Sequence, residues 1–101
     1  MRALVVGGDH VEVIKKEMAA WGVRHIEHWD GRKAGHSRRV IPKDTAVVVI
    51  FWDNVSHELA RNVRRLAWRL DLPVVYCRRA LGPIRQTLEA LNEDGVLRLR
   101  G

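Results

Sequence analysis

Four short apolar runs alternate along the chain with longer segments whose apolar residues recur every three or four positions. The runs cover residues 2–6, 23–28, 45–51 and 74–77. Their length and their valine and isoleucine content predict β-strands. The run over 45–51 predicts a central strand that is buried on both faces, because it is continuously apolar or β-branched. The run over 23–28 alternates polar and apolar residues, which predicts a more exposed strand.

The segments between these runs predict helices, since their apolar residues follow the helical period. The predicted helices cover residues 10–21, 37–41, 55–70 and 83–91. The expected inward stripes are Val11, Ile14, Met18 and Trp21, then Leu59, Val63, Leu66 and Leu70, and last Ile84, Leu88 and Leu91. We expect Asp9 to cap the first helix and Gly22 to end it. Asp53, Asn54 or Ser56 is expected to cap the helix over 55–70.

Strands that alternate with helices predict a single three-layer α/β domain over residues 1–101, with a frayed or edge-strand tail over 95–101. The expected sheet is parallel, has four strands in the order 2-1-3-4, and is Rossmann-like (flavodoxin-like). The chain then reverses direction between the first and third strands. Ligands of such sheets bind at the carboxyl ends of the strands, near the reversal. We therefore expect a polar crevice at that edge of the sheet.

Composition narrows the class of protein without naming a function. A hydrophobic content of 47% among 101 residues suffices for one modest core. No apolar run reaches the roughly 18 residues of a membrane span, and the start of the chain is too short and too soon broken by glycine for a signal peptide. The lone cysteine, Cys77, fits a reducing cytoplasm, where we expect the protein. The net charge of +6 favours nucleic acid, an acidic protein or an anionic small molecule as partner, unless the arginine surplus has no functional meaning.

Glycine and polar residues follow every predicted strand and are the candidate ligand-binding residues. They are Gly7, Gly8, Asp9 and His10, then His28, Asp30 and Gly31, then Asn54, Ser56 and His57, and last Arg78 and Arg79. Paired glycines let the backbone approach an anion and expose helix amides to it, and arginines supply countercharge. The alternative is structural, since glycines also form turns and Asp30 and Ser56 are suitable capping residues.

Histidines raise a second hypothesis, a metal site. His10, His28 and His57 each lie at a predicted strand end, and with a nearby aspartate they satisfy the ligand count of zinc or iron. No His-x-x-x-His or Cys-x-x-Cys spacing supports this site, so it depends on the topology to bring the imidazoles together. Haem is a further alternative, although so small a domain offers little apolar volume for a macrocycle.

The predicted helix over 55–70 also carries a basic outer face. Its members are Arg61, Arg64, Arg65, Trp68 and Arg69. Arginines beside a tryptophan can bind phosphates and stack a base, which would make this face a nucleic-acid surface. The alternative is a solvated helix face whose arginine stems cover the edge of the core. The same surface allows a homodimer, but no heptad or edge pattern specifies one.

Several junction motifs together carry a family resemblance over nearly the whole chain. They are Val6-Gly7-Gly8, His28-x-Asp30-Gly31, Val55-Ser56-His57 followed by Ala60, and Val74-Val75-Tyr76-Cys77-Arg78-Arg79. The chain resembles an uncharacterised bacterial family, domain of unknown function family 2325. Other members have adjacent histidines or His-Asp-Gly-Gly at the second junction, or cysteines around Val-Ser-His, where this chain has Trp29 and Asp53-Asn54. The resemblance implies a Rossmann-like domain with its signature at the strand ends, and it implies no activity.

Three functions follow as expectations. The first is a non-catalytic or regulatory domain that binds an anionic ligand, either a nucleotide or a nucleic-acid phosphate. The second is a sensor-like protein that binds a metal or haem through histidines. The third is a small hydrolase or phosphoryl-transfer enzyme that uses His57 as its base.

Overall fold

The four predicted strands form one parallel sheet in the order β2-β1-β3-β4 in the computed structural model, as the sequence predicts. The structure describes residues 1–30 and 39–95. In chain order the elements are β1 (Arg2–Val6), α1 (Glu12–Ala20), β2 (His25–Trp29), β3 (Thr45–Phe51), the 3-10 turn η2 (Trp52–Asn54), α2 (His57–Arg69), β4 (Val74–Cys77) and α3 (Leu81–Glu93). Within those two ranges, no helix has the length and apolar content that crossing a membrane requires.

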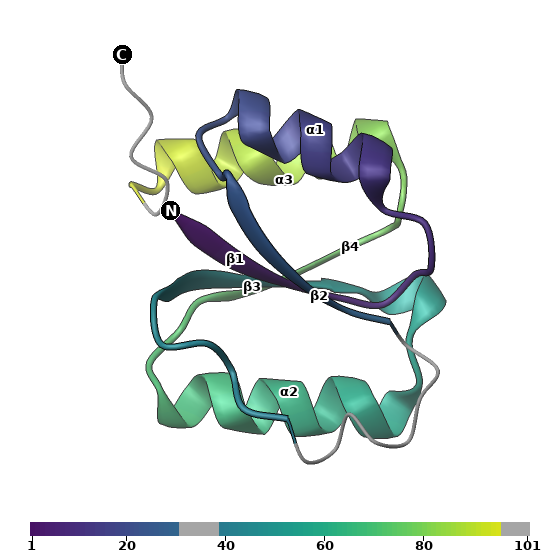
Figure 1. Cartoon of the computed structure of the whole chain (residues 1–101), viewed down its shortest axis with the longest axis vertical. Helices are drawn as coiled ribbons and strands as arrows, with labels where there is room; N and C mark the ends of the chain where they lie inside the picture. Colours follow the sequence, from purple (N-terminus) through teal and green to yellow (C-terminus); the bar gives the residue numbers. More distant parts are fainter. Residues whose placement is uncertain (31–38, 96–101) are drawn as a thin grey trace.

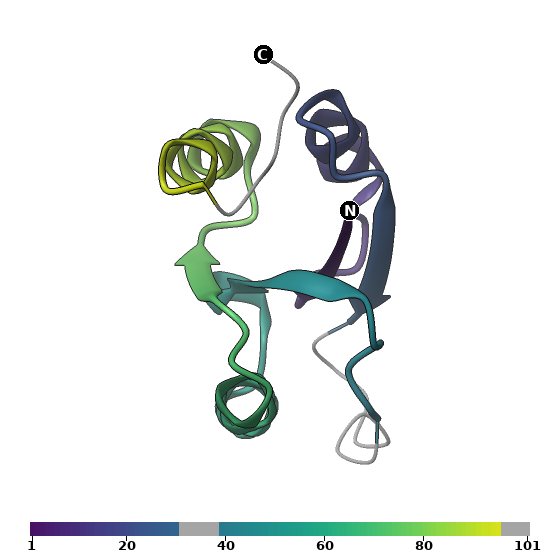
Figure 2. The same cartoon turned by 90° about the vertical axis from the view of Figure 1, so that its left-hand side faces the viewer.

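The helices cover the sheet from both sides and give the three layers of a Rossmann-like domain. Helices α1 and α3 lie on one face, and α2 lies on the other (Figures 1 and 2). β3 is the central strand and is almost wholly buried, whereas β2 and β4 form the two edges. β2 is mostly half-buried, as its alternating pattern predicts.

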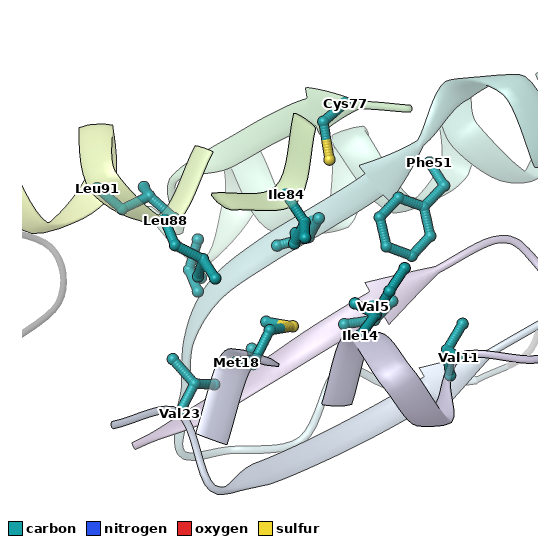
Figure 3. Close-up of a cluster of buried hydrophobic side chains, with 13 residues drawn as sticks. Val5, Val11, Ile14, Met18, Val23, Phe51, Cys77, Ile84, Leu88 and Leu91 are labelled. Carbon is teal, nitrogen blue, oxygen red and sulfur yellow. The ribbon is translucent and has the colours of Figure 1, made fainter. Parts of the chain in front are cut away.

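The face under α1 and α3 holds the larger of two cores. Alternate residues of β1 and β3, such as Val5 and Phe51, meet Met18 of α1 and Ile84 of α3 (Figure 3). The predicted inward stripes of α1 and α3 are confirmed, apart from Trp21, which is only half-buried. Gly22 follows α1 with a φ of 90°, as expected for the residue that ends a helix.

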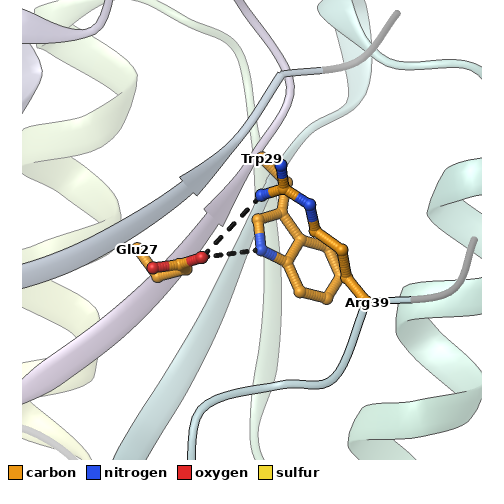
Figure 4. A network of polar contacts seen from close by, with 3 residues as sticks. All are labelled: Glu27, Trp29 and Arg39. Atoms are coloured by element: carbon orange, nitrogen blue, oxygen red, sulfur yellow. Dashed lines mark hydrogen bonds and ion pairs between the residues drawn. The ribbon is translucent and has the colours of Figure 1, made fainter. Parts of the chain in front are cut away.

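The opposite face is covered by α2 and by the segment that leads into β3. Trp29 and Ile41 complete the core beside β1, where no helix of the described chain lies. The Trp29 indole donates a hydrogen bond to Glu27 at 3.2 Å, and the Arg39 guanidinium lies over the Trp29 ring and 3.8 Å from the same carboxylate (Figure 4). These contacts fix the segment that enters β3 against the end of β2.

Some local predictions are wrong. Residues 39–41 of the short helix predicted over 37–41 are irregular, and its first two residues lie outside the described ranges. Asp9 does not cap α1, which starts at Glu12 after Val11 and has no side-chain cap. Leu70 is 55% exposed because α2 ends just before it. Ala67 takes the inward position instead, one helical turn after Val63. Of the tail predicted over 95–101, only Gly95 is described.

Candidate functional site

All four strands point the same way, so the junctions that follow them gather at one edge of the sheet (Figure 1). This is the edge at which the sequence predicts a crevice. The structure divides it into two parts. Around the turn after β1, internal hydrogen bonds close the space. On the α2 side, near β4, an open pocket lies between the helix and the sheet.

The Gly7-Gly8 turn is closed by the backbone. The Gly7 amide donates to the Trp29 carbonyl at 2.8 Å, and the Gly8 amide donates to the Asn54 carbonyl at 3.0 Å. Both glycines are buried and have positive φ angles, 106° and 75°. The prediction that these two amides hold an anion is therefore wrong, because protein carbonyls already accept both hydrogen bonds. Asn54, another predicted site residue, takes part in this turn through its backbone carbonyl, which accepts the hydrogen bond from Gly8.

Arg79 ties three junctions together and is not a free countercharge. Its amide donates to Asp53 Oδ1 at 3.1 Å, and its guanidinium donates to the His10 carbonyl at 3.0 Å. The stem crosses Gly8 so closely that a Cβ added there would lie 2.5 Å from Arg79 Cδ. Arg79 thus braces the junctions after β1, β3 and β4 through its amide and its side chain together. Its Nε is buried without a hydrogen-bond partner in the described structure.

The histidines do not share a pocket. His28 pairs in register with Val5, whose side chain belongs to the core under α1 and α3, and its Nε2 lies 2.9 Å from the Gly7 carbonyl oxygen. His57 begins α2 on the other side of the sheet. Within residues 1–30 and 39–95, no three His, Cys, Asp or Glu side chains are placed to hold a metal ion. The predicted metal site of His10, His28 and His57 is therefore wrong.

The structure places three other predicted site residues at the ends of β1 and β2 and at the start of α2. Ser56 caps α2, because its hydroxyl accepts a hydrogen bond from the Leu59 amide at 3.2 Å. Asp9 is exposed after the Gly7-Gly8 turn, and Asp30 is half-buried after β2. Gly31 lies outside the described residues.

Cys77 is a poor candidate for a nucleophile or a metal ligand. Burial raises the pKa of its thiol, and the negative charge of Asp53 acts in the same direction. A hydrogen bond with Thr87 acts against this shift but does not reverse it. The thiol therefore stays protonated near neutral pH, and the thiolate is the form that attacks or binds a metal.

The open part of the edge is a pocket of ≈ 300 Å³ on the α2 face of the sheet. Its lining residues come from β3, η2, α2 and β4: Ile50, Trp52, His57, Ala60, Arg61, Arg64 and Tyr76. Ile50 and Tyr76 are register partners on neighbouring strands, so both side chains project toward α2. β4 is an edge strand, and this leaves Tyr76 uncovered on its outer side.

The pocket combines exposed aromatic rings with positive charge. Trp52 is 52% exposed and Tyr76 is 46% exposed, although both are large enough to be buried in a core. Arg61 and Arg64 approach from α2. Among the described residues, no carboxylate lines this space. The arrangement suits a ligand that has a flat unsaturated group and a negative charge.

Arg78 orients one wall of this pocket. Its guanidinium carbon lies 5.4 Å from the centroid of the Trp52 ring, within the range of a cation–π contact. Arg78 itself is exposed after β4. Arg78 is not among the residues that line the pocket, and its partner in this structure is the Trp52 ring. Its predicted role as a countercharge for a ligand stays a prediction.

The predicted basic face of α2 is divided between two flanks. Arg61 and Arg64 face the pocket, whereas Arg65 and Arg69 line shallow grooves on the other flank with Glu58, Asn62 and Leu66. Trp68 is 80% exposed. The two flanks meet at Arg61, which lines both the pocket and the first groove.

Four pocket residues are absent from the sequence-based predictions of the site. They are Ile50, Trp52, Ala60 and Tyr76. Trp52 stands at a strand end and Tyr76 interrupts the valines of the last strand, so an aromatic at each position was a usable signal. Ile50 and Ala60 give no such signal, because small and aliphatic residues at these positions are expected to be ordinary core residues.

Comparison with known proteins bears on the family and leaves the activity open. No curated protein and no solved structure matches the chain. A family model described as "Uncharacterized protein conserved in bacteria (DUF2325)" matches residues 2–91. This confirms the resemblance carried by the strand-end motifs. The chain belongs to this bacterial family.

Proposed function

We propose that the domain binds a nucleotide, either free or as one unit of a nucleic acid, in the pocket between α2 and β4. The base would lie against Trp52 and Tyr76, and the phosphate would face Arg61 and Arg64. One observation carries the proposal: two exposed aromatic side chains and two arginines line the same ≈ 300 Å³ pocket, with no carboxylate among its described lining residues.

The size and chemistry of the pocket favour this class of ligand. Ligand pockets commonly occupy about 300–1,000 Å³, so this one suits a single small ligand. Stacking of a base on an aromatic side chain contributes about 1–3 kcal/mol. A guanidinium offers a planar fork of donors that matches a phosphate and keeps its charge at any physiological pH. The base and the phosphate of a nucleotide thus each have a matching group at this site.

The position of the pocket adds to the attraction for an anion. It lies beside the first two turns of α2, where the helix dipole presents its positive end. The cation–π contact of Arg78 holds the Trp52 ring in place before a ligand arrives. The chain carries a net charge of +6, which attracts phosphates over longer distances.

Binding is favoured over catalysis at this site. His57 is the candidate base, and its imidazole has no hydrogen bond or ion pair with any described residue. A general base is commonly oriented by a neighbouring acceptor, as in the histidine–carboxylate pairs of hydrolases. We therefore assign His57 to the wall of a binding pocket.

Arg64 and Arg65 allow a matched test. They are neighbours on one helix, both exposed and both of charge +1, but only Arg64 lines the pocket. In calorimetric titrations with AMP or UMP, we expect Arg64→Ala to raise Kd about tenfold, since it removes a charged hydrogen bond of roughly 1.5 kcal/mol. Trp52→Ala should raise Kd by about fivefold or more through lost stacking.

Arg65→Ala is the control, and it should change Kd by no more than about twofold at 0.15 M salt, where screening acts within about 8 Å. If Arg64→Ala and Arg65→Ala raise Kd equally, the arginines act only by general charge attraction and not by contact in the pocket. Absence of binding at millimolar nucleotide would contradict the proposal outright.

A further inference from the structure

We infer that the ligand is single-stranded nucleic acid, whose strand runs from the pocket along one flank of α2 to Trp68. This inference rests on the proposed function and extends it, because it uses residues outside the pocket. Its starting point is Trp68, a tryptophan that is 80% exposed on the outer surface of α2.

Helical geometry places Trp68 in line with the pocket. Relative to His57, the residues Arg61, Arg64 and Trp68 follow at intervals of four, seven and eleven positions. Residues at such intervals lie along one flank of a helix. With a rise of 1.5 Å per residue, Trp68 stands about 10 Å along the axis from Arg61. A strand with stacked bases would need about three nucleotides to cover that distance, given a rise of about 3.4 Å per base.

Charge along this flank is complementary to a phosphate backbone. α2 contains four arginines and one acidic residue, Glu58. Glu58 lies on the far flank, where it shares a groove with Asn62, Arg65 and Arg61, the residue at which the two flanks meet. The flank between the pocket and Trp68 therefore presents Arg61 and Arg64, and Glu58 approaches only the Arg61 end of it.

The spacing of aromatic side chains favours a single strand as the occupant. Trp52 and Tyr76 lie at one end of the arginine row, and Trp68 lies at the other. Proteins that bind single strands combine a basic groove with aromatic rings on which successive bases stack. In a duplex the base faces are already stacked on one another and are closed to such rings. A second copy of this chain is a poor occupant, because it would set one arginine row against another.

Oligonucleotide length provides the test. Uridine oligomers of one, two, four and eight nucleotides are titrated into the full chain, with thymidine oligomers of the same lengths as the deoxy series. We expect the affinity to rise at least tenfold from one to four nucleotides and to change little from four to eight. A rise in either series supports a binding track that runs along α2 from the pocket to Trp68 (the track). The series in which the rise occurs shows whether the bound strand is RNA or DNA.

Variants distinguish the track from the pocket. Trp68→Ala should weaken tetranucleotide binding about fivefold or more, as expected for one lost stacking contact, and should leave nucleoside monophosphate binding unchanged. Val13→Ala is the control: Val13 is also an exposed apolar residue, on α1 across the sheet, and its loss should change neither affinity. Circular dichroism checks that both variants fold.

The outcomes separate the two proposals. If the monophosphate binds with the predicted sensitivity to Arg64→Ala but the tetranucleotide binds no tighter, the track is wrong and the pocket stands. If a duplex binds as tightly as the single strand and Trp68→Ala has no effect, the track is also wrong. If no nucleotide or oligomer binds, both proposals are wrong.

Discussion

Gly7 and Gly8 show how single residues determine which part of the strand-end edge stays open. A Cβ at Gly7 would lie 3.0 Å from the Asn54 carbonyl oxygen and 3.1 Å from that of Phe51. Only glycine permits this approach at a φ of 106°. The close approach lets the turn after β1 pack directly on the turn after β3, so no ligand-sized space is left between them.

Replacement of Gly7 should therefore be costly, whereas a glycine in open space should tolerate alanine. We expect Gly7→Ala to lower the free energy of unfolding by about 2–4 kcal/mol, from left-handed backbone strain and the contact with Asn54. Gly82→Ala is the control: no atom lies within 4 Å of its added Cβ in the first turn of α3. It should be neutral or stabilise by up to about 1 kcal/mol. Urea unfolding followed by circular dichroism measures both, and similar values for the two would contradict this account of the turn.

The tryptophans have different environments despite their shared chemistry. Trp29 is 1% exposed and packs in the core beside Ile41, whereas Trp52 and Trp68 stand largely in solvent. Burial of a large aromatic ring is favourable, so an exposed ring forgoes that stabilisation. Trp52 and Trp68 both lie near the arginines of α2, and this is why we assign them to ligand binding.

At the scale of elements, α2 combines a core-facing side with an exposed side that carries its arginines. Its inner stripe of Leu59, Val63 and Ala67 fixes the helix on the sheet. The position of that stripe determines where every other side chain of the helix points. Arg64 therefore faces the pocket and Arg65 faces away, although the two are adjacent in the sequence.

Ser56 sets the start of α2 and can be tested apart from binding. Ser56→Ala should destabilise the protein by about 1 kcal/mol, because the Leu59 amide loses its acceptor. Ser56→Asp should keep the cap and the stability, since aspartate is an equally good capping residue. Its added carboxylate, one residue before His57, should nevertheless weaken nucleotide binding severalfold. Chemical denaturation and calorimetric titration are run on both variants, and equal stability of Ser56→Ala and the parent would argue against the cap.

The strands and the main helices could be predicted from sequence because their patterns are local. The run over 45–51 is apolar enough to be a central strand in almost any context, and the leucine spacing of α2 and α3 is helical. The errors arose where tertiary contacts decide the outcome. Residues 39–41 are irregular, because Ile41 is buried beside Trp29 and the Arg39 guanidinium lies over the Trp29 ring. Asp9 is a good capping residue, but α1 begins three positions later.

At the scale of the whole molecule, the sheet topology predicts the edge at which the open pocket lies but not the face of the sheet on which it opens. The sequence predicts that the glycines, aspartates, histidines and arginines of the junctions lie at one edge of the sheet, and the parallel strand order brings the described junctions to that edge. It cannot show that the amides of Gly7 and Gly8 donate to protein carbonyls or that the Arg79 guanidinium is held by His10, since these partners lie more than 20 residues away in the chain. The open space lies instead toward the β4 edge, under α2.

The central claim is that nucleotide binds between α2 and β4, and amide and indole NMR shifts test it most directly. A ¹⁵N-labelled sample is titrated with UMP to saturation, and the indole resonances of the four tryptophans are followed together with the backbone. We predict large shifts for the Trp52 indole and for the amides of His57, Arg61, Arg64 and Tyr76, with the Trp21 indole on the far face unchanged. Shifts confined to Gly8, His28 and the turn after β1, or no shifts at all, would contradict the account.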